Sequence, residues 1–268
     1  MTARPGFLEL DGRRLETCWW GPGPEAAPSL VLLHEGLGSV SLWRDWPERL
    51  AAATGCGVLA YSRFGYGQSD PAAPPPPWPL TYMHDEAREV LPRVLDAAGL
   101  RRCVLVGHSD GASIAAIYAG SRQDFRVAGL VLLAPHSFVE ATSLEGIRAA
   151  RQRWETTDWR DRLARHHRDP EGAFRGWNGA WLDPGFPQVF DLQPDLAHIR
   201  VPILIVQGEA DPYGTVEQVR LAEQECYCPV ESLVLPGVGH APQQEAAGAV
   251  LDAVREFVAR ALAAASEK

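Results

Sequence analysis

Residues 103–111 read CVLVGHSDG, an apolar run that leads directly into the pentapeptide GHSDG at 107–111. The eight residues that follow, 112–119, read ASIAAIYA and have the composition of a helix. A G-x-S-x-G pattern between a strand and a helix forms a sharp turn that exposes the serine hydroxyl. The two glycines suit such a turn because a Cβ atom would clash with the neighbouring chain. The stretch therefore predicts that Ser109 lies exposed at the edge of a sheet.

Two further apolar runs are each followed by a loop that carries a candidate partner for Ser109. Residues 201–206 (VPILIV) precede a loop with Asp211, and residues 231–235 (ESLVL) precede a loop with His240. A serine hydroxyl is a weak nucleophile at neutral pH and needs an adjacent base, which His240 would supply. A carboxylate such as Asp211 would hold the imidazole in the correct tautomer. These residues are the candidate catalytic set.

The chain order of nucleophile, acid and base, each in the loop after a strand, resembles the α/β-hydrolase superfamily. The resemblance extends from the first apolar run to the last helical pattern. Glu209 is an alternative acid because it lies two residues before Asp211. Some members of the superfamily carry the acid after the preceding strand. Here residues 133–136 (LAPH) hold no carboxylate, and the next one is Glu140.

Apolar runs recur along the whole chain, at residues 29–33, 57–61, 103–106, 130–133, 201–206 and 231–235. Several are apolar throughout, as expected for strands of a parallel sheet that helices cover on both faces. Helical patterns alternate with them, which predicts an α/β fold with a doubly wound, mostly parallel sheet. Residues 7–10 and 14–19 predict an initial antiparallel hairpin. Pro92 is expected to kink or interrupt a helix over residues 83–98.

The resemblance implies two units, a core domain of residues 1–135 and 201–268 and a helical cap of residues 136–200. The cap segment has no strand-like run but holds four of the nine tryptophans. Ligand pockets are lined largely by apolar and aromatic side chains. Three of these tryptophans are therefore candidate substrate contacts: Trp154, Trp177 and Trp181. The alternative is that they form only the small core of the cap.

Two backbone N–H groups must stabilise the negative charge that develops on the substrate oxygen. One is expected from Asp110, at the start of the helix, where the dipole also favours negative charge. The loop at 34–39 (HEGLGS) is similar to the family's His-Gly-x motif, and this implies Gly36 as the second donor. Glu35 stands where the family has a glycine, so the amide of Glu35 or Leu37 is an alternative donor.

Three more side chains near this predicted oxyanion hole are candidate contacts. The Asp110 carboxylate either interacts with the helix dipole or provides a counter-charge for a cationic substrate. Glu35 adds a second carboxylate and is a candidate substrate contact. Residues 63–69 (RFGYGQS) are similar to a glycine-rich family loop, in which Tyr66 is a candidate pocket wall.

Composition narrows the class of partner. The formal net charge of −9 argues against nucleic acid and against an anionic membrane. No apolar leader and no run of about 18 apolar residues is present, which predicts a cytoplasmic location. The pair His166–His167 and Glu171 have no further ligand at a suitable spacing to complete a metal site, so no metal is expected. We expect a small-molecule substrate and no cofactor.

The resemblance implies a serine hydrolase that cleaves a small carboxylic ester, lactone or thioester through an acyl-enzyme. A carbon–carbon bond hydrolase or a cofactor-free haloperoxidase would use the same triad. Epoxide hydrolases and haloalkane dehalogenases resemble the chain less, because their nucleophile is aspartate. A non-catalytic, hydrolase-like ligand receptor is the alternative from a different class of protein.

Overall fold

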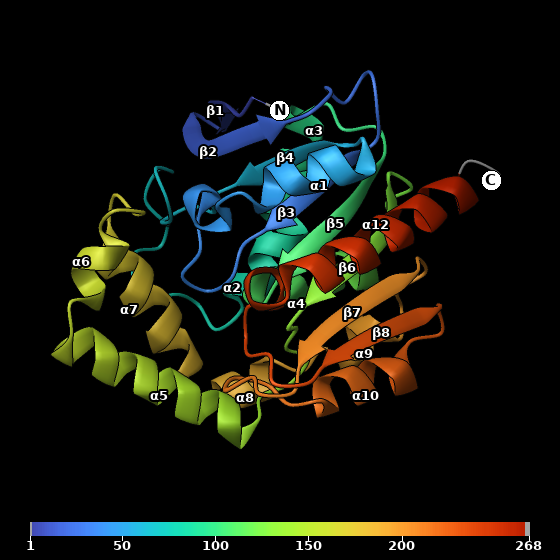
Figure 1. Ribbon diagram of the computed structural model, residues 1–268. Helices are drawn as coiled ribbons and strands as arrows, with labels where there is room; N and C mark the ends of the chain where they lie inside the picture. The colour runs from blue at the N-terminus through green and yellow to red at the C-terminus, as the bar shows by residue number, and fades with distance from the viewer. Residues whose placement is uncertain (1, 266–268) are drawn as a thin grey trace.

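One eight-stranded sheet forms the centre of the protein in the computed structural model, which describes residues 2–265 (Figure 1). The strands are β1 (Arg4–Leu10), β2 (Arg13–Trp20), β3 (Ser29–Leu33), β4 (Gly57–Tyr61), β5 (Cys103–His108), β6 (Val127–Leu133), β7 (Ile203–Gly208) and β8 (Val230–Leu235). Their spatial order is β1-β2-β4-β3-β5-β6-β7-β8. The β1–β2 hairpin is antiparallel and β2 pairs antiparallel with β4, whereas the other pairs are parallel. The predicted doubly wound α/β fold is confirmed.

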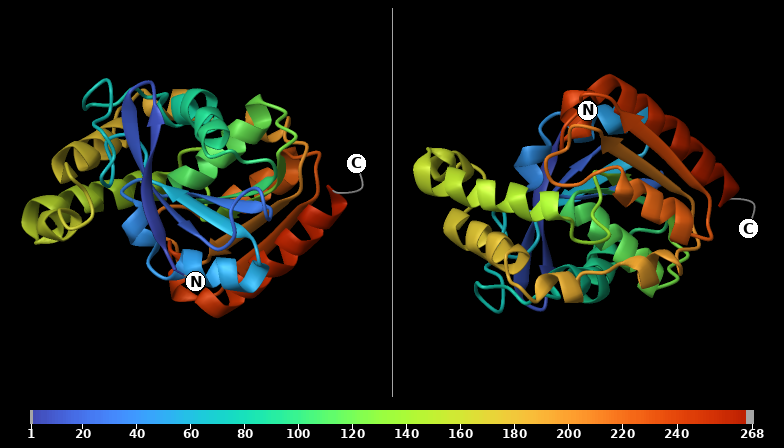
Figure 2. Two further views of the ribbon diagram at one scale, coloured as in Figure 1. Left: turned by 90° about the horizontal axis from the view of Figure 1, so that it is seen from above. Right: turned by 90° about the horizontal axis from the view of Figure 1, so that it is seen from below.

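Helices cover both faces of this sheet (Figure 2). They are η1 (Val40–Trp43), α1 (Trp46–Thr54), α2 (Tyr82–Asp85), η2 (Glu86–Val90), α3 (Leu91–Ala97), α4 (Asp110–Ser121), α5 (Ala141–Thr156), α6 (Trp159–Leu163), α7 (Pro170–Trp181), α8 (Phe186–Val189), α9 (Gln193–Leu196), α10 (Glu217–Glu225), α11 (Pro242–Glu245) and α12 (Ala247–Ala264). Helices α1 and α12 pack on one face, and α2, α3 and α4 pack on the other. No helix within residues 2–265 is long and apolar enough to cross a membrane.

Burial on both faces explains why the central strands read as continuous apolar runs. Every residue of β3, β4, β5, β6 and β7 is buried. Leu30, Leu50 and Phe257 of α12 belong to the core cluster on one face, and Leu105 and Ile114 of α4 belong to the cluster on the other. Each such side chain contributes about 1.5–3 kcal/mol when it leaves water. This packing fixes the carboxyl ends of the strands, from which the loops of the candidate site project.

The backbone accommodates Pro92 by a change of helical type. The segment η2 is a π-helical turn, and α3 begins at Leu91 directly after it. Pro92 therefore lies just after the π-helical turn, and it has no N–H to donate to the carbonyls of that turn. The predicted interruption is present, but the chain continues helically through it.

The segment between β6 and β7 contains α5–α9, and α5, α6 and α7 lie to one side of the sheet (Figure 1). Among its described residues, the segment between β6 and β7 forms no strand and has one isolated β-bridge, between Phe138 and Asp191. Ser143 of α5 donates a hydrogen bond to the Tyr213 carbonyl in the loop after β7 (2.5 Å). The segment is thus attached at the carboxyl end of the strands.

Candidate active site

Ser109 occupies the tight turn between β5 and α4, as predicted, but the prediction that it lies exposed is wrong: only 6% of the residue is exposed, because its hydroxyl packs against the imidazole of His240. Its backbone is strained, with φ 53° and ψ −119° in a region that non-glycine residues rarely adopt. Such a conformation costs about 1–3 kcal/mol and persists only where the surrounding structure enforces it. A Cβ on Gly107 would overlap the backbone of Gly111, and a Cβ on Gly111 would overlap the Leu33 carbonyl. The two glycines thus allow the turn to pack against the end of β3.

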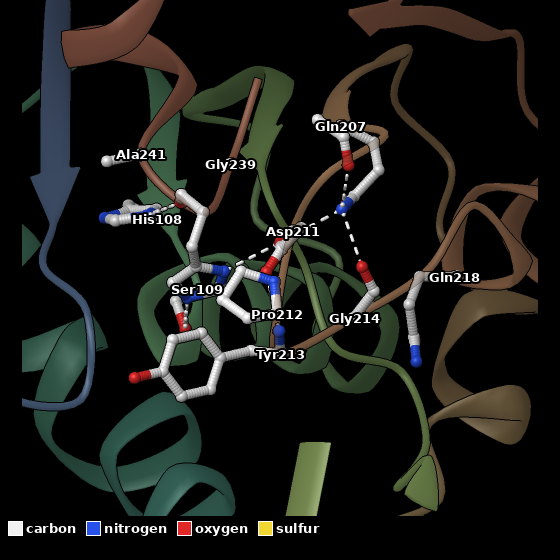
Figure 3. Close-up of polar contacts among 12 residues, drawn as sticks. His108, Ser109, Gln207, Asp211, Pro212, Tyr213, Gly214, Gln218, Gly239 and Ala241 are labelled. Atoms are coloured by element: carbon white, nitrogen blue, oxygen red, sulfur yellow. Dashed lines mark hydrogen bonds and ion pairs between the residues drawn. The ribbon is translucent and has the colours of Figure 1, made fainter. Parts of the chain in front are cut away.

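A continuous chain of hydrogen bonds joins Ser109, His240 and Asp211. His240 Nε2 lies 2.9 Å from Ser109 Oγ, and His240 Nδ1 lies 2.7 Å from Asp211 Oδ2. Asp211 also accepts from the Tyr213 amide at 2.8 Å and from Gln207 Nε2 at 3.0 Å (Figure 3). An ionised Asp211 requires the Nδ1 proton on His240, which leaves Nε2 free to accept the proton of Ser109.

The carboxylate that contacts His240 belongs to Asp211 and not to the nearby Glu209. Burial alone would raise the pKa of Asp211, but the hydrogen bond and charge of His240 outweigh it and lower the pKa. The side chain of Glu209 is exposed at the surface. The structure therefore brings Asp211, and not Glu209, to the imidazole.

The loop of residues 34–39, which we call the β3 loop, is held by Arg63. Its Nη1 donates to the His34 carbonyl (2.6 Å) and its Nη2 to the Glu35 carbonyl (3.0 Å). In a trans peptide the N–H points opposite to the C=O, so the amides of Glu35 and Gly36 face away from Arg63. A Cβ on Gly111 would lie 2.7 Å from the His34 carbonyl oxygen, so the loop passes directly beside the turn. Asp110 begins α4, and its amide has no partner inside the helix.

His34 supports the same loop. Its Nδ1 donates to the Glu35 carbonyl (2.7 Å), and its Nε2 accepts from the amide of Arg63 (3.1 Å). Burial and the nearby Arg63 charge hold the pKa of His34 well below its ordinary value. The imidazole is therefore neutral and shapes the backbone.

Both carboxylates that were expected near substrate are engaged with protein groups. Asp110 accepts from the Tyr82 hydroxyl (2.5 Å) and from Trp181 Nε1 (3.3 Å), and burial raises its pKa. Glu35 Oε2 lies 3.5 Å from His108 Nδ1. The Asp110 carboxylate thus links Tyr82 of α2 to Trp181 of α7 through its two hydrogen bonds.

The aromatic candidates lie at two different places. Trp177 packs on the β3 loop, where a Cβ on Gly36 would overlap its indole nitrogen. Trp181 meets the ring of His136 edge-on at 5.2 Å. Trp154 instead stacks on Phe174 between α5 and α7 (4.2 Å). The Tyr66 side chain is buried behind the β3 loop, edge-on to the rings of His34 (4.9 Å) and Trp78 (5.0 Å).

Three aromatic side chains beside His240 were not predicted from the sequence. Tyr213, His108 and His136 have ring centroids 4.7, 5.2 and 5.7 Å from that of His240. His136 Nδ1 is buried without a hydrogen-bond partner among residues 2–265, and burial beside His240 lowers its pKa to about 3. Both histidines occur where a strand ends, the same criterion that singled out Asp211 and His240. No group of three metal-ligating side chains gathers within the described residues.

Comparisons with known proteins place this geometry in context. The sequence model of the Alpha/beta hydrolase family matches residues 30–253. A putative carbamate hydrolase of Caulobacter segnis is 33% identical over 125 residues, which cover 46% of this chain and 43% of that protein. Epoxide hydrolase B of Mycobacterium tuberculosis is 31% identical over 127 residues, 47% of this chain and 33% of that one. The matched part is therefore less than half the length of these curated relatives.

Solved structures show the same fold at lower identity. The enol-lactonase of Burkholderia xenovorans superimposes with a TM-score of 0.71 at 22% identity, covering 95% of this chain and 100% of that one. A carboxylesterase of Bacillus subtilis gives a TM-score of 0.69 at 23% identity, covering 96% and 92%. These likenesses extend over nearly the whole chain.

Proposed function

The chain belongs to the alpha/beta hydrolase family, and on this premise we propose that it is a serine hydrolase that works through an acyl-enzyme. The substrate is a small carboxylic ester, lactone or thioester. The observation that carries the proposal is the hydrogen-bonded chain from Ser109 through His240 to Asp211. The same proposal places the enzyme in the cytoplasm.

In the first half-reaction Ser109 Oγ attacks the carbonyl carbon while His240 Nε2 takes its proton. The amides of Asp110 and Gly36 donate to the oxygen of the tetrahedral intermediate. His240 then returns the proton to the leaving group, and the carbon–oxygen or carbon–sulfur bond breaks. In the second half-reaction His240 takes a proton from water as the water oxygen bonds to the acyl carbon. The bond from that carbon to Ser109 Oγ then breaks, His240 returns the proton to Oγ, and the carboxylic acid leaves.

Residues 136–200 form the proposed cap, and residues 1–135 and 201–268 the proposed core domain. Trp177 and Trp181 are the proposed pocket walls, since one packs on the β3 loop and the other lies beside His136. A substrate contact at Glu35, Trp154 or Tyr66 has less support, because these side chains are paired or packed as described above.

Three curated relatives bear the name epoxide hydrolase, so hydrolysis of an epoxide is the alternative reaction to consider. The nucleophile position in this chain holds Ser109, whereas the epoxide hydrolases of this fold are expected to attack through aspartate. The proposal of ester-type chemistry rests on this difference.

The test is a panel of p-nitrophenyl esters, lactones and acyl thioesters, combined with fluorophosphonate labelling of the protein. The wild type should turn over at least one acyl class and should be labelled at Ser109. Ser109→Ala should lose turnover and labelling while its circular dichroism is unchanged. The matched control is Ser121→Ala, an exposed serine at the end of α4, which should retain both. Turnover by Ser109→Ala above about a tenth of the wild-type rate would exclude the mechanism, because removal of a triad nucleophile costs several orders of magnitude.

A further inference from the structure

We propose that Glu35 and His108 are positioning residues, an ion pair that holds the β3 loop in place relative to the loop of His240. This inference rests on the proposed function, since it assigns the pair to the alignment of the oxyanion donors with the base. It concerns two side chains outside the triad, one of which stands where the family's loop carries glycine.

The imidazole of His108 contacts three separate segments. His108 ends β5, and 4% of it is exposed. Its Nε2 lies 2.6 Å from the main-chain carbonyl of His240, and its Nδ1 lies 3.5 Å from Glu35 Oε2. Nε2 of Gln243 in α11 lies 3.1 Å from the same Nδ1. His108, the residue before Ser109, therefore contacts both the β3 loop and the loop of His240, the two loops that act on the substrate in the proposed mechanism.

The contacts require a particular protonation of the ring. A carbonyl can only accept, so Nε2 must carry a proton and donate to His240. A carboxylate beside Nδ1 favours a second proton there, which makes the ring an imidazolium and the contact an ion pair. In the structure the NH₂ group of Gln243 faces Nδ1, an orientation that suits a neutral ring. A half-turn of this amide would bring its Oε1, which has no hydrogen-bond partner among residues 2–265, to accept from the imidazolium.

The electrostatic surroundings agree with this charge. Burial disfavours the charged ring, but Glu35 and the His240 carbonyl outweigh burial and raise the pKa of His108. Burial would raise the pKa of Glu35, but His108 outweighs it and lowers that pKa to about 2, although 30% of the side chain is exposed. Asp211 also favours the charge on His108. Two further titratable rings face the same cluster, that of neutral His136 and that of His240, whose centroid lies 5.2 Å from that of His108. On the η1 side the ring faces Trp43, which carries no charge.

The pair and Arg63 hold the β3 loop from two directions. Arg63 fixes the carbonyls of His34 and Glu35, and the Glu35 carboxylate fixes the loop to the end of β5. Without the carboxylate the amide of Gly36 is free to shift relative to Ser109. Displacement of a catalytic group by about 1 Å can cost 10²-fold in rate. The glutamate in place of the family's glycine thus has a physical role.

The test compares Glu35→Gln and His108→Gln with the wild type, and uses Glu9→Gln on the exposed face of β1 as the matched control. Each variant of the pair should lower kcat about tenfold with little change in KM, less than the 10²–10³ lost when an oxyanion donor is removed. The double variant should be no slower than the slower single variant, because both changes break one contact. Glu9→Gln should match the wild type.

The pH profile is a readout that a merely structural role would not move. As pH rises through the raised pKa of His108, the imidazolium is lost and kcat/KM of the wild type should fall. In Glu35→Gln and in His108→Gln the ion pair is absent at every pH, so kcat/KM of both variants should lack this fall. Glu35→Asp keeps the charge on a shorter side chain, and serves if the neutral variant proves unstable.

A measurement without turnover completes the test. The His108 ring is titrated by NMR in Ser109→Ala, with and without Glu35→Gln, and the second change should lower the pKa of that ring. An unchanged titration, or an active wild type that Glu35→Gln equals in kcat and pH profile, overturns the inference alone. A wild type with neither turnover nor fluorophosphonate labelling overturns the proposed function, and the inference with it.

Discussion

At Asp211, each oxygen of a single carboxylate has an assigned donor. The Tyr213 amide donates to Oδ1, while His240 and Gln207 meet Oδ2. In Asp211→Asn an NH₂ group can replace Oδ2, and it would donate to His240 Nδ1. The imidazole proton would then reside on Nε2, which could no longer accept the proton of Ser109. We expect kcat to fall by about 10⁴, as the same exchange does in a serine protease.

The measurement is kcat on the best ester of the panel, with thermal unfolding as a check on folding. Glu209→Gln is the control, because this exposed carboxylate lies two residues away and is not bound to the imidazole. If Glu209→Gln were the damaging change and Asp211→Asn harmless, the assignment of the acid would be wrong.

At the scale of elements, the β3 loop and α7 meet at a point with no room for a methyl group. A Cβ on Gly36 would overlap the indole nitrogen of Trp177. Gly36→Ala must therefore displace the loop or the helix, and overpacking of this kind costs about 1–3 kcal/mol. We expect lower thermal stability together with a lower kcat, because the same loop supplies a proposed oxyanion donor.

The control for this change is Gly248→Ala in α12, where a Cβ meets nothing within 4 Å. Alanine is favoured over glycine inside a helix by about 0.5–1 kcal/mol, so this variant should be slightly more stable. Replacing Trp177 by leucine in the Gly36→Ala background should restore part of the lost stability. An equal effect of both glycine changes would show that the loop and α7 are not tightly packed.

Elements that depend on local pattern were predictable from sequence, whereas contacts that depend on packing were not. The runs that became β3, β5 and β7 are apolar throughout because both of their faces are buried. The change to a π-helical turn before Pro92 depends on hydrogen-bond geometry that no residue pattern indicates. In the same way, the chain order pointed to the loops of Asp211 and His240, but the bond from Tyr82 to Asp110 spans 28 residues and follows from how α2 packs on α4.

At the scale of the whole molecule, buried neutral histidines make the fold sensitive to acid. Burial lowers the pKa of His136 to about 3 and that of His167 to about 4. Both values lie below the ordinary value of about 6.5 for an unfolded chain, so the unfolded state binds protons first as the pH falls. Stability contributed by these groups is present above pH 6.5 and is lost progressively toward the folded values. At pH 5 each histidine accounts for a loss of about 2 kcal/mol.

The ion pair of His108 acts in the opposite direction, because its pKa is raised in the folded state. Its contribution is complete below pH 6.5 and is lost as pH rises through the folded value. The free energy of unfolding in urea, measured at pH 7 and at pH 5, gives the net effect of these opposite contributions. His136→Asn should reduce the difference between the two pH values, whereas His198→Asn at the exposed surface should leave it unchanged. If the free energy of unfolding changed equally between pH 7 and pH 5 in the wild type, His136→Asn and His198→Asn, His136 would be charged in the folded state.

The strained turn at Ser109 carries a consequence for how such a protein changes over generations. Glycine adopts that backbone conformation without steric cost, so Ser109→Gly would relieve strain and favour the folded state. Under the proposed mechanism, any lineage or directed-evolution experiment screened only for heat resistance would therefore accumulate glycine at this position and lose turnover. Retention of serine there requires selection on activity, generation after generation. The identity of residue 109 in thermally selected variants is thus a direct record of whether turnover was under selection.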